Sequence, residues 1–284
     1  MKYYLSLQAL GDNLISLSLL QQLNFKVNIL GTKHTKNIVK LLDLEDQFNV
    51  QVVFDDIPAF YDIRKRGFLQ AIKHLYTLIR YIQKNQISEI IFEKKDLRST
   101  FILFFTNIKG HFPNNINKKI YKNRKDLIEN IYQQPINLNS YILKIENPKK
   151  IVINPLTRVE LRNINKSHLN FIINELRKYN YEIYLIDIEK RYQEFENKVQ
   201  YYLTNTTLED VKQLIKGCDL YVGGDSFLIH LAYYLQRNYF MIFYRDNDDF
   251  LPPNITDNFY IKAHGSGNFN DELKLKLKNI GLIK

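Results

Sequence analysis

Short apolar runs alternate with longer amphipathic stretches along the first part of the chain. Tyr3–Leu7 is an apolar run of strand length, and Leu14–Leu23 has the apolar spacing of a helix, with Gly11-Asp12-Asn13 as a turn between them. The same alternation continues to residue 107. It predicts further strands at Lys26–Leu30, Val50–Phe54 and Ser88–Phe92, and helices at His34–Leu42, Arg66–Lys84 and Leu97–Asn107.

The region from Asn114 to Pro148 has a different character, because it is rich in Asn and Lys. It predicts a basic helical segment and then an interdomain connection near residues 136–148. Beyond this connection the alternation of strands and helices resumes. The predicted strands are Ile151–Asn154, Tyr181–Asp187, Val199–Leu203, Leu220–Val222 and Tyr239–Tyr244, and the predicted helices are Ser167–Tyr179, Leu208–Lys216, Phe227–Leu235 and Asp271–Leu277.

This order of elements predicts an α/β fold. Strands that alternate with helices form parallel sheets that are covered on both faces. The length of 284 residues suits two domains of about 140 residues each. We therefore expect two Rossmann-like lobes, at residues 1–140 and 149–284.

The composition is that of an ordered protein in a reducing compartment. Hydrophobic residues make up 45% of the chain and charged residues 25%, which is not a disordered composition. The single cysteine, Cys218, has no partner for an internal disulfide. The N-terminus lacks the apolar run of a secretory signal, and no apolar run is long enough to span a bilayer. We expect a cytoplasmic protein.

The net charge of +10 favours anionic partners, which include nucleic acid, acidic lipid and phosphorylated substrates. The stretch Arg64–Lys84 is basic and amphipathic. The simpler interpretation, which we favour, is a helix packed on the first sheet with a charged outer face. The alternative is contact with the anionic inner face of a membrane.

Asp12 is the first candidate for chemistry. It follows a predicted strand and precedes a predicted helix, so its side chain suits an N-cap. Ligands of open α/β sheets bind beyond the carboxyl ends of strands, and a carboxylate there can remove a proton from an acceptor hydroxyl. The sequence alone leaves both roles open. The glycine spacing of a dinucleotide-binding motif is absent.

A second candidate segment, Asn154–Asn163, follows the first predicted strand of the second half. Thr157, Arg158 and Arg162 lie in the connection to the next helix. A phosphate would meet backbone N–H groups and guanidinium donors there. The alternative is a solvated basic loop, of which this chain has many.

The third candidate segment, Cys218–His230, contains Gly223-Gly224 after a buried strand. These glycines permit a tight turn, and Asp225-Ser226 would open the next helix. Free N–H groups and the helix dipole at such a position suit a diphosphate. His230, one turn into the helix, fits a packed or capping residue better than a catalytic one. No cluster of His, Cys and carboxylate residues has metal-ligand spacing, so we expect no metal site.

Together these segments resemble the heptosyltransferases of bacterial glycosyltransferase family 9. The first-lobe motif stands here as Leu10-Gly-Asp-Asn-Leu-Ile-Ser16. The second-lobe motif stands as Leu220-Tyr-Val-Gly-Gly-Asp-Ser-Phe-Leu-Ile-His-Leu-Ala232 and is the more specific of the two. Ile90–Ser99 looks like the acceptor-side loop of the family. Phe227 stands where the family has a glycine, which leaves the identity of the sugar open.

The resemblance implies a GT-B architecture with a cleft between the lobes. It also implies inverting transfer of a sugar, a heptose or another, from a nucleotide-diphosphate donor, without a cofactor or an essential metal. The acceptor would be a lipopolysaccharide, a lipooligosaccharide or another surface glycan. By the same resemblance Asp12 is the general base. The implied donor contacts are Thr157, Arg158, Arg162, Gly224, Asp225, Ser226 and His230, and the implied acceptor contacts are Gly11, Asn13, Lys95 and Arg98.

Three other functions remain open. One is a two-lobed sugar-nucleotide epimerase, and another is an inactive relative that only binds a nucleotide sugar. The third is a nucleic-acid-binding protein, which the net charge of +10 suggests. Because no aromatic-basic platform or known nucleic-acid module is present, we expect no nucleic-acid partner.

Overall fold

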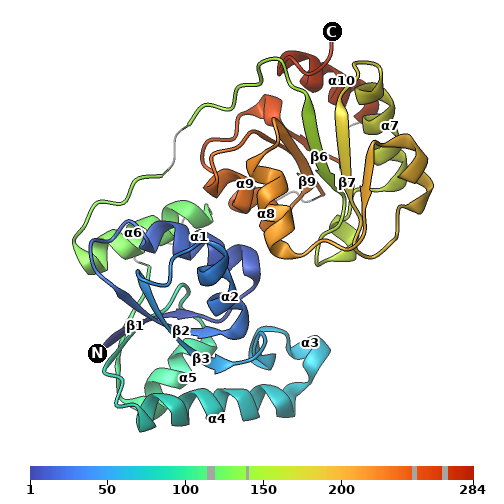
Figure 1. Ribbon diagram of the computed structural model, residues 1–284. Helices are drawn as coiled ribbons and strands as arrows, with labels where there is room; N and C mark the ends of the chain where they lie inside the picture. The colour runs from blue at the N-terminus through green and yellow to red at the C-terminus, as the bar shows by residue number, and fades with distance from the viewer. Residues whose placement is uncertain (114–118, 139–140, 245–247, 264–267) are drawn as a thin grey trace. The chain divides into compact units, whose positions relative to one another are not determined.

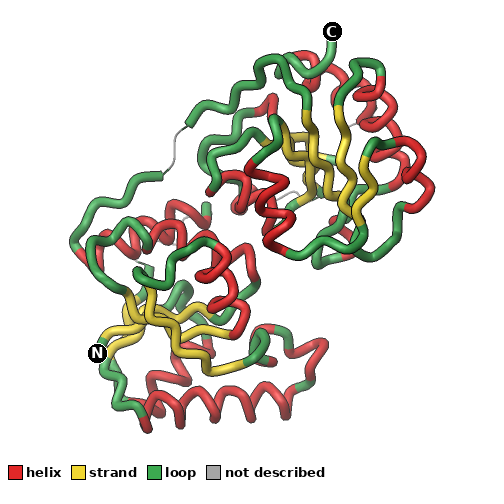
Figure 2. Tube along the Cα trace, in the orientation of Figure 1, coloured by secondary structure: helices red, strands yellow, loops and turns green. Residues whose placement is uncertain are grey.

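The computed structural model describes residues 1–113, 119–138, 141–244, 248–263 and 268–284 (Figure 1). The chain divides into two compact units, unit 1 at Met1–Leu138 and unit 2 at Asn139–Lys284. In each unit the strands gather in one layer with helices on both sides (Figure 2). The predicted α/β fold with two Rossmann-like lobes is therefore confirmed.

Unit 1 contains a five-stranded parallel sheet with the order β3-β2-β1-β4-β5. Helices α1 and α2 cover one face of this sheet, and α4 and α5 cover the other (Figure 1). The strands are β1 (Lys2–Ser6), β2 (Val27–Thr32), β3 (Phe48–Phe54), β4 (Glu89–Ile91) and β5 (Lys109–His111). The helices are α1 (Leu10–Leu20), α2 (Lys33–Leu41), α3 (Ile63–Arg66), α4 (Phe68–Lys84), α5 (Leu97–Thr106) and α6 (Ile120–Tyr132).

Unit 2 contains a six-stranded parallel sheet with the order β11-β10-β9-β6-β7-β8. Strands β9 and β10 are buried along their whole length, as expected for a sheet covered on both faces. The strands are β6 (Lys150–Asn154), β7 (Glu182–Ile186), β8 (Tyr201–Leu203), β9 (Leu220–Gly224), β10 (Tyr239–Phe243) and β11 (Tyr260–Lys262). The helices are α7 (Lys166–Arg177), α8 (Leu208–Lys216), α9 (Phe227–Tyr234) and α10 (Phe269–Asn279).

Two predicted boundaries near the candidate site are wrong. Helix α1 begins at Leu10 and not at Leu14, so Gly11, Asp12 and Asn13 are helical residues and not a turn. Strand β9 continues through Gly224, because Gly223 and Gly224 pair with Met241 and Ile242 of β10. The two glycines therefore belong to the sheet and do not form a tight turn.

The region predicted as a basic helix and a connection contains α6. Residues 114–118 and 139–140 of that region lie outside the described residues. Strands β5 and β11 were not predicted. Each has only three residues and lies at a sheet edge, so neither has an apolar run that stands out in the sequence.

Candidate functional site

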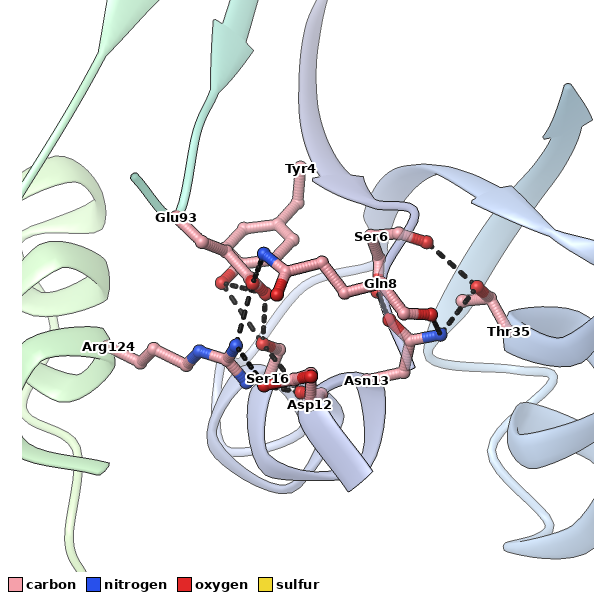
Figure 3. A network of polar contacts seen from close by, with 9 residues as sticks. All are labelled: Tyr4, Ser6, Gln8, Asp12, Asn13, Ser16, Thr35, Glu93 and Arg124. Carbon is pink, nitrogen blue, oxygen red and sulfur yellow. Dashed lines mark hydrogen bonds and ion pairs between the residues drawn. The ribbon is translucent and has the colours of Figure 1, made fainter. Parts of the chain in front are cut away.

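The two inner strands β1 and β4 define the candidate site of unit 1. They are neighbours in the sheet, but the helices that follow them, α1 and α5, cover opposite faces. Such a switch point opens a crevice at the carboxyl ends of the strands, where ligands of this fold class bind. Figure 3 shows Gln8 and Asp12 near the end of β1 and Glu93 just after β4.

Asp12 lies in the first turn of α1. The N-cap of this helix is Ala9, whose backbone is extended and whose side chain makes no capping bond. The N-cap role predicted for Asp12 is therefore wrong, because the helix begins two residues earlier than Asp12. A carboxylate in the first turn is still stabilised by the helix dipole. The side chain of Asp12 is 22% exposed, so a ligand can reach it.

Arg124 of α6 connects Asp12 to Glu93 (Figure 3). Its Nη2 lies 2.7 Å from Glu93 Oε2 and 3.3 Å from Asp12 Oδ1, and its Nη1 donates to the carbonyl of Asp12. The side chains of Arg124 and Glu93 are each only 4% exposed. A guanidinium is charged at every ordinary pH, so a fixed positive charge lies against the Asp12 carboxylate.

Glu93 is the buried centre of this network. Besides Arg124, it accepts hydrogen bonds from Gln8 Nε2 at 2.7 Å, from Tyr4 OH at 3.0 Å and from Ser16 Oγ. Burial raises the pKa of Glu93, and the positive charge of Arg124 offsets part of this rise. With this many partners, Glu93 fixes the position of Arg124 and, through it, that of Asp12.

Burial alone would lower the pKa of Arg124, but the negative charges of Glu93 and Asp12 reverse this and raise it. Burial also raises the pKa of Tyr4, and the neighbouring charge of Glu93 raises it further. The phenol of Tyr4 therefore stays protonated and remains a hydrogen-bond donor to Glu93.

Asn13, expected to contact the acceptor, lies inside unit 1. Its side-chain amide donates to Thr35 Oγ1 at 3.1 Å and to the carbonyl of Gln8, and its Oδ1 accepts from Ser6 Oγ at 2.8 Å. These bonds tie the start of α1 to β1 and α2 (Figure 3). The structure therefore gives Asn13 a supporting position beneath the site. Gly11, next to Asp12, is partly exposed in the first turn of α1.

Lys95 and Arg98 follow β4. Arg98 is held by the protein: its Nε donates to Asp96 Oδ2 at 2.9 Å, and its guanidinium lies 4.3 Å from the centre of the Tyr61 ring. The side chain of Lys95 is exposed and lies over Phe112. A pocket lined in part by Gln8, Tyr61, Glu93 and Arg98 has a volume of about 20 Å³, which is room for a water molecule.

Unit 2 has a corresponding switch point between β6 and β9. The loop after β6 crosses closely over the end of β9 at Gly224. A Cβ atom on Gly224 would lie 2.9 Å from Thr157 Cγ2 and 3.0 Å from the carbonyl oxygen of Arg162. Glycine is therefore required here by the close approach of the loop and not by a turn.

The same loop carries the predicted donor-binding residues. Arg162 Nη1 lies 3.3 Å from Asp225 Oδ2, so the structure brings these two predicted residues together. Thr157 is bound within the loop, since its N–H donates to Asn163 Oδ1 at 2.6 Å and its hydroxyl to the carbonyl of Val159 at 2.7 Å. Arg158 is exposed to solvent.

Ser226 is the N-cap residue of α9, but its hydroxyl does not cap the helix. The Ser226 Oγ and Tyr221 OH atoms are both buried. Burial raises the pKa of Tyr221, and the nearby hydroxyl of Ser226 offsets part of this rise, so the two side chains are neighbours. His230 lies further along α9 and is buried, in agreement with a packed residue.

A family model and several solved structures match this chain. The model of glycosyltransferase family 9 (heptosyltransferase) matches residues 65–265. The chain belongs to glycosyltransferase family 9. This confirms the resemblance seen in the sequence motifs. A comparison with functionally curated proteins finds no match.

Solved structures that share the fold of this family 9 chain include the following three. The E. coli heptosyltransferase WaaC with ADP-2-deoxy-2-fluoro heptose is 14% identical, with 98% of this chain and 99% of that chain covered and a TM-score of 0.66. A family 9 glycosyltransferase from Veillonella parvula DSM 2008 is 10% identical, with 98% and 96% covered and a TM-score of 0.68. E. coli ADP-heptose lps heptosyltransferase II is 14% identical, with 98% and 99% covered and a TM-score of 0.59.

Glu93 and Arg124 are candidate functional residues that the sequence did not reveal. The family model covers both, but it begins after Asp12. Glu93 had two signals in the sequence: it directly follows the apolar run of β4, and it lies within Ile90–Ser99, the segment that resembles the acceptor-side loop of the family. Arg124 had none, because it stands among many Lys and Arg residues.

In the part of the chain that the structure describes, no group of three or more His, Cys, Asp and Glu side chains is arranged to hold a metal ion. Among the same residues, no helix is both long enough and apolar enough to cross a membrane.

Proposed function

We propose that this family 9 chain transfers a sugar from a nucleotide-diphosphate donor to a hydroxyl group of a surface glycan or glycolipid, with a lipopolysaccharide as the first acceptor to test. The observation that carries the proposal is the position of Asp12. It is partly exposed at the switch point of unit 1 and is held by Arg124 and Glu93. Because E. coli WaaC was solved with an ADP-heptose analogue, ADP-sugars are the first donors to test.

In the proposed reaction the Asp12 carboxylate removes the proton of the acceptor hydroxyl. The acceptor oxygen then forms a bond to the anomeric carbon of the donor. The bond from that carbon to the diphosphate breaks on the opposite face, and the nucleoside diphosphate leaves with the electron pair. This single displacement inverts the configuration at the anomeric carbon and uses no metal or cofactor. Arg124 and Glu93 are positioning residues that hold Asp12.

The donor would bind to unit 2. The leaving diphosphate gains negative charge in the transition state, and donors fixed in place stabilise such charge most effectively. Arg158 and Arg162 supply guanidinium groups, and the first turn of α9 supplies N–H groups. The hydroxyl of Ser226, the N-cap residue of α9, lies at the same helix end. These four features support a diphosphate site in unit 2.

Asp12→Asn tests the proposed base. We expect turnover to fall by a factor of about 10²–10⁴, the usual contribution of a general base, with unchanged donor affinity. Asp46→Asn, at an exposed carboxylate of unit 1, is the matched control and should keep full turnover. If Asp12→Asn retains the turnover of the control, the assignment of the base is wrong.

Phe227 favours a second candidate function, binding of a nucleotide sugar without transfer. It stands at the first position of α9, where the family has a glycine, and it is partly exposed. A side chain there restricts the approach of a phosphate to the helix. Donor consumption without any acceptor would indicate an epimerase. Donor binding without turnover would indicate an inactive relative.

A further inference from the structure

The outer surface of helices α4 and α5 carries large apolar side chains that the core does not use. On α4, Phe68, Leu69 and Ile72 are exposed, Leu69 to 82%. On α5, Leu97, Phe101 and Phe104 are exposed, Leu97 to 89% and Phe104 to 79%. We call these six residues the α4–α5 surface. Exposed apolar groups that gather in one place mark a site of interaction.

The apolar side of α4 is turned towards α5. Leu69, Tyr76 and Gln83 are seven residues apart and therefore lie on the same side of α4. Gln83 Nε2 donates to the backbone carbonyl of Phe105 on α5 at 2.9 Å, so this side of α4 is directed towards α5. Both helices cover the same face of the sheet (Figure 1).

The core of unit 1 is formed by a different side of α4. Ala71, Leu78 and Ile82 are buried in the core cluster beneath the helix. The helix does pack on the first sheet, as the favoured interpretation of the sequence required. Its outer side, however, is apolar as well as charged, which that interpretation did not include.

The charge on the helices of this surface is basic, although Asp96 precedes Leu97 and Asp56 pairs with Arg66. Helices α3 and α4, with the single residue between them, contain no Asp or Glu. Arg80 of α4 donates from Nε to Tyr76 OH at 2.6 Å, which places a guanidinium beside the apolar side of the helix. The six basic residues of this segment are Arg64, Lys65, Arg66, Lys73, Arg80 and Lys84.

We propose that the α4–α5 surface binds an anionic lipid bilayer. Apolar side chains of this kind enter the boundary between headgroups and acyl chains, while Lys and Arg side chains reach the phosphate groups. The charge complementarity selects a bilayer with anionic headgroups. The proposal depends on this surface alone and not on the proposed sugar transfer. It would, however, bring unit 1 to an acceptor held in a membrane.

Co-sedimentation with vesicles tests the proposal. The wild type should bind vesicles of phosphatidylcholine mixed with phosphatidylglycerol and should not bind vesicles of phosphatidylcholine alone. Leu69→Ser/Phe104→Ser should weaken binding about a hundredfold, or about tenfold for each apolar side chain removed from the interface. The matched control, Ile142→Ser/Leu275→Ser, changes two exposed apolar residues of unit 2 and should bind like the wild type.

A charge variant, Arg64→Gln/Lys65→Gln, should bind more weakly by about fivefold for each charge removed. Because all the altered side chains are exposed, circular dichroism should show unchanged folding. The proposal is overturned if Leu69→Ser/Phe104→Ser and Ile142→Ser/Leu275→Ser bind vesicles equally well, or if the wild type binds none. A third result would also overturn it: the wild type forms a concentration-dependent dimer and binds no vesicles, and Leu69→Ser/Phe104→Ser abolishes the dimer. That result would assign the surface to a second copy of the chain. Normal donor binding by all these proteins would show that only the membrane proposal has failed.

Discussion

Replacement of Arg124 by Met removes the guanidinium that joins Glu93 to Asp12. The bond of 2.7 Å to Glu93 and the contact of 3.3 Å to Asp12 are both lost. Loss of one partner from a buried ion pair typically costs about 3–5 kcal/mol, because the other charge is left without compensation. Burial already raises the pKa of Glu93, so this carboxyl can take up a proton, and we expect a cost of about 3 kcal/mol.

Urea unfolding followed by circular dichroism measures this cost, since the chain has no Trp for fluorescence. The two units can unfold in separate transitions, so the transition of unit 1 is the one to compare. Arg64→Met, at an exposed arginine, is the control and should change the free energy of unfolding by less than about 0.5 kcal/mol. The double variant Arg124→Met/Glu93→Gln should be more stable than Arg124→Met, because it removes the unpaired charge.

The pH dependence gives an independent check. Without Arg124, Glu93 has a folded-state pKa above its unfolded-state pKa, so the folded state binds more protons. Stability then falls as pH rises through this range. The stability that Arg124→Met loses relative to the wild type should therefore be large at pH 8 and smaller at pH 5. The coupling of the two residues would be refuted if Arg124→Met lowered the free energy of unfolding by less than about 1 kcal/mol. It would also be refuted if the effects of Arg124→Met and Glu93→Gln on this free energy were additive.

Two further predictions concern unit 2. Gly224→Ala should cost about 1–3 kcal/mol of stability by overpacking and should weaken donor binding, because the new Cβ would lie 2.9 Å from Thr157 Cγ2 and 3.0 Å from the Arg162 carbonyl. Gly217→Ala is the control, since its Cβ meets no atom closer than 3.5 Å, and equal effects would contradict the argument. Burial raises the pKa of Cys218 to about 12, so a thiol reagent at pH 8 should label the native protein very slowly and the denatured protein at once. Rapid labelling of the native protein would show that this thiol is accessible.

Most of the fold could be predicted from the sequence because the sheets are buried on both faces. Strands such as β1, β6 and β10 are apolar runs bounded by polar residues, and this pattern is local. The start of α1 could not be predicted, because Ala9 is not a residue that caps a helix with its side chain. The edge strand β5 could not be predicted either, since its three residues depend on pairing with β4.

The sequence revealed Asp12 but not the residues that hold it. Glu93 lies 77 positions from Ser16 and 31 positions from Arg124 in the chain, yet it hydrogen-bonds to both. Periodicity and spacing describe neighbours along the chain and contain no information on such contacts. For the same reason the buried position of Asn13 was not apparent, although its place next to Asp12 was.

Binding of the donor is the most direct test of the central claim, because it requires no knowledge of the acceptor. Thermal unfolding should be measured with a panel of nucleoside diphosphates and nucleotide sugars, beginning with ADP and ADP-heptose. A ligand at about 100 times its Kd adds about 2.7 kcal/mol, which raises the Tm of a unit of this size by about 5–10 °C. We predict such a shift for the wild type and for Asp12→Asn, and a smaller one for Arg162→Gln. An unchanged Tm across the whole panel would contradict the assignment of a nucleotide-sugar donor to this chain.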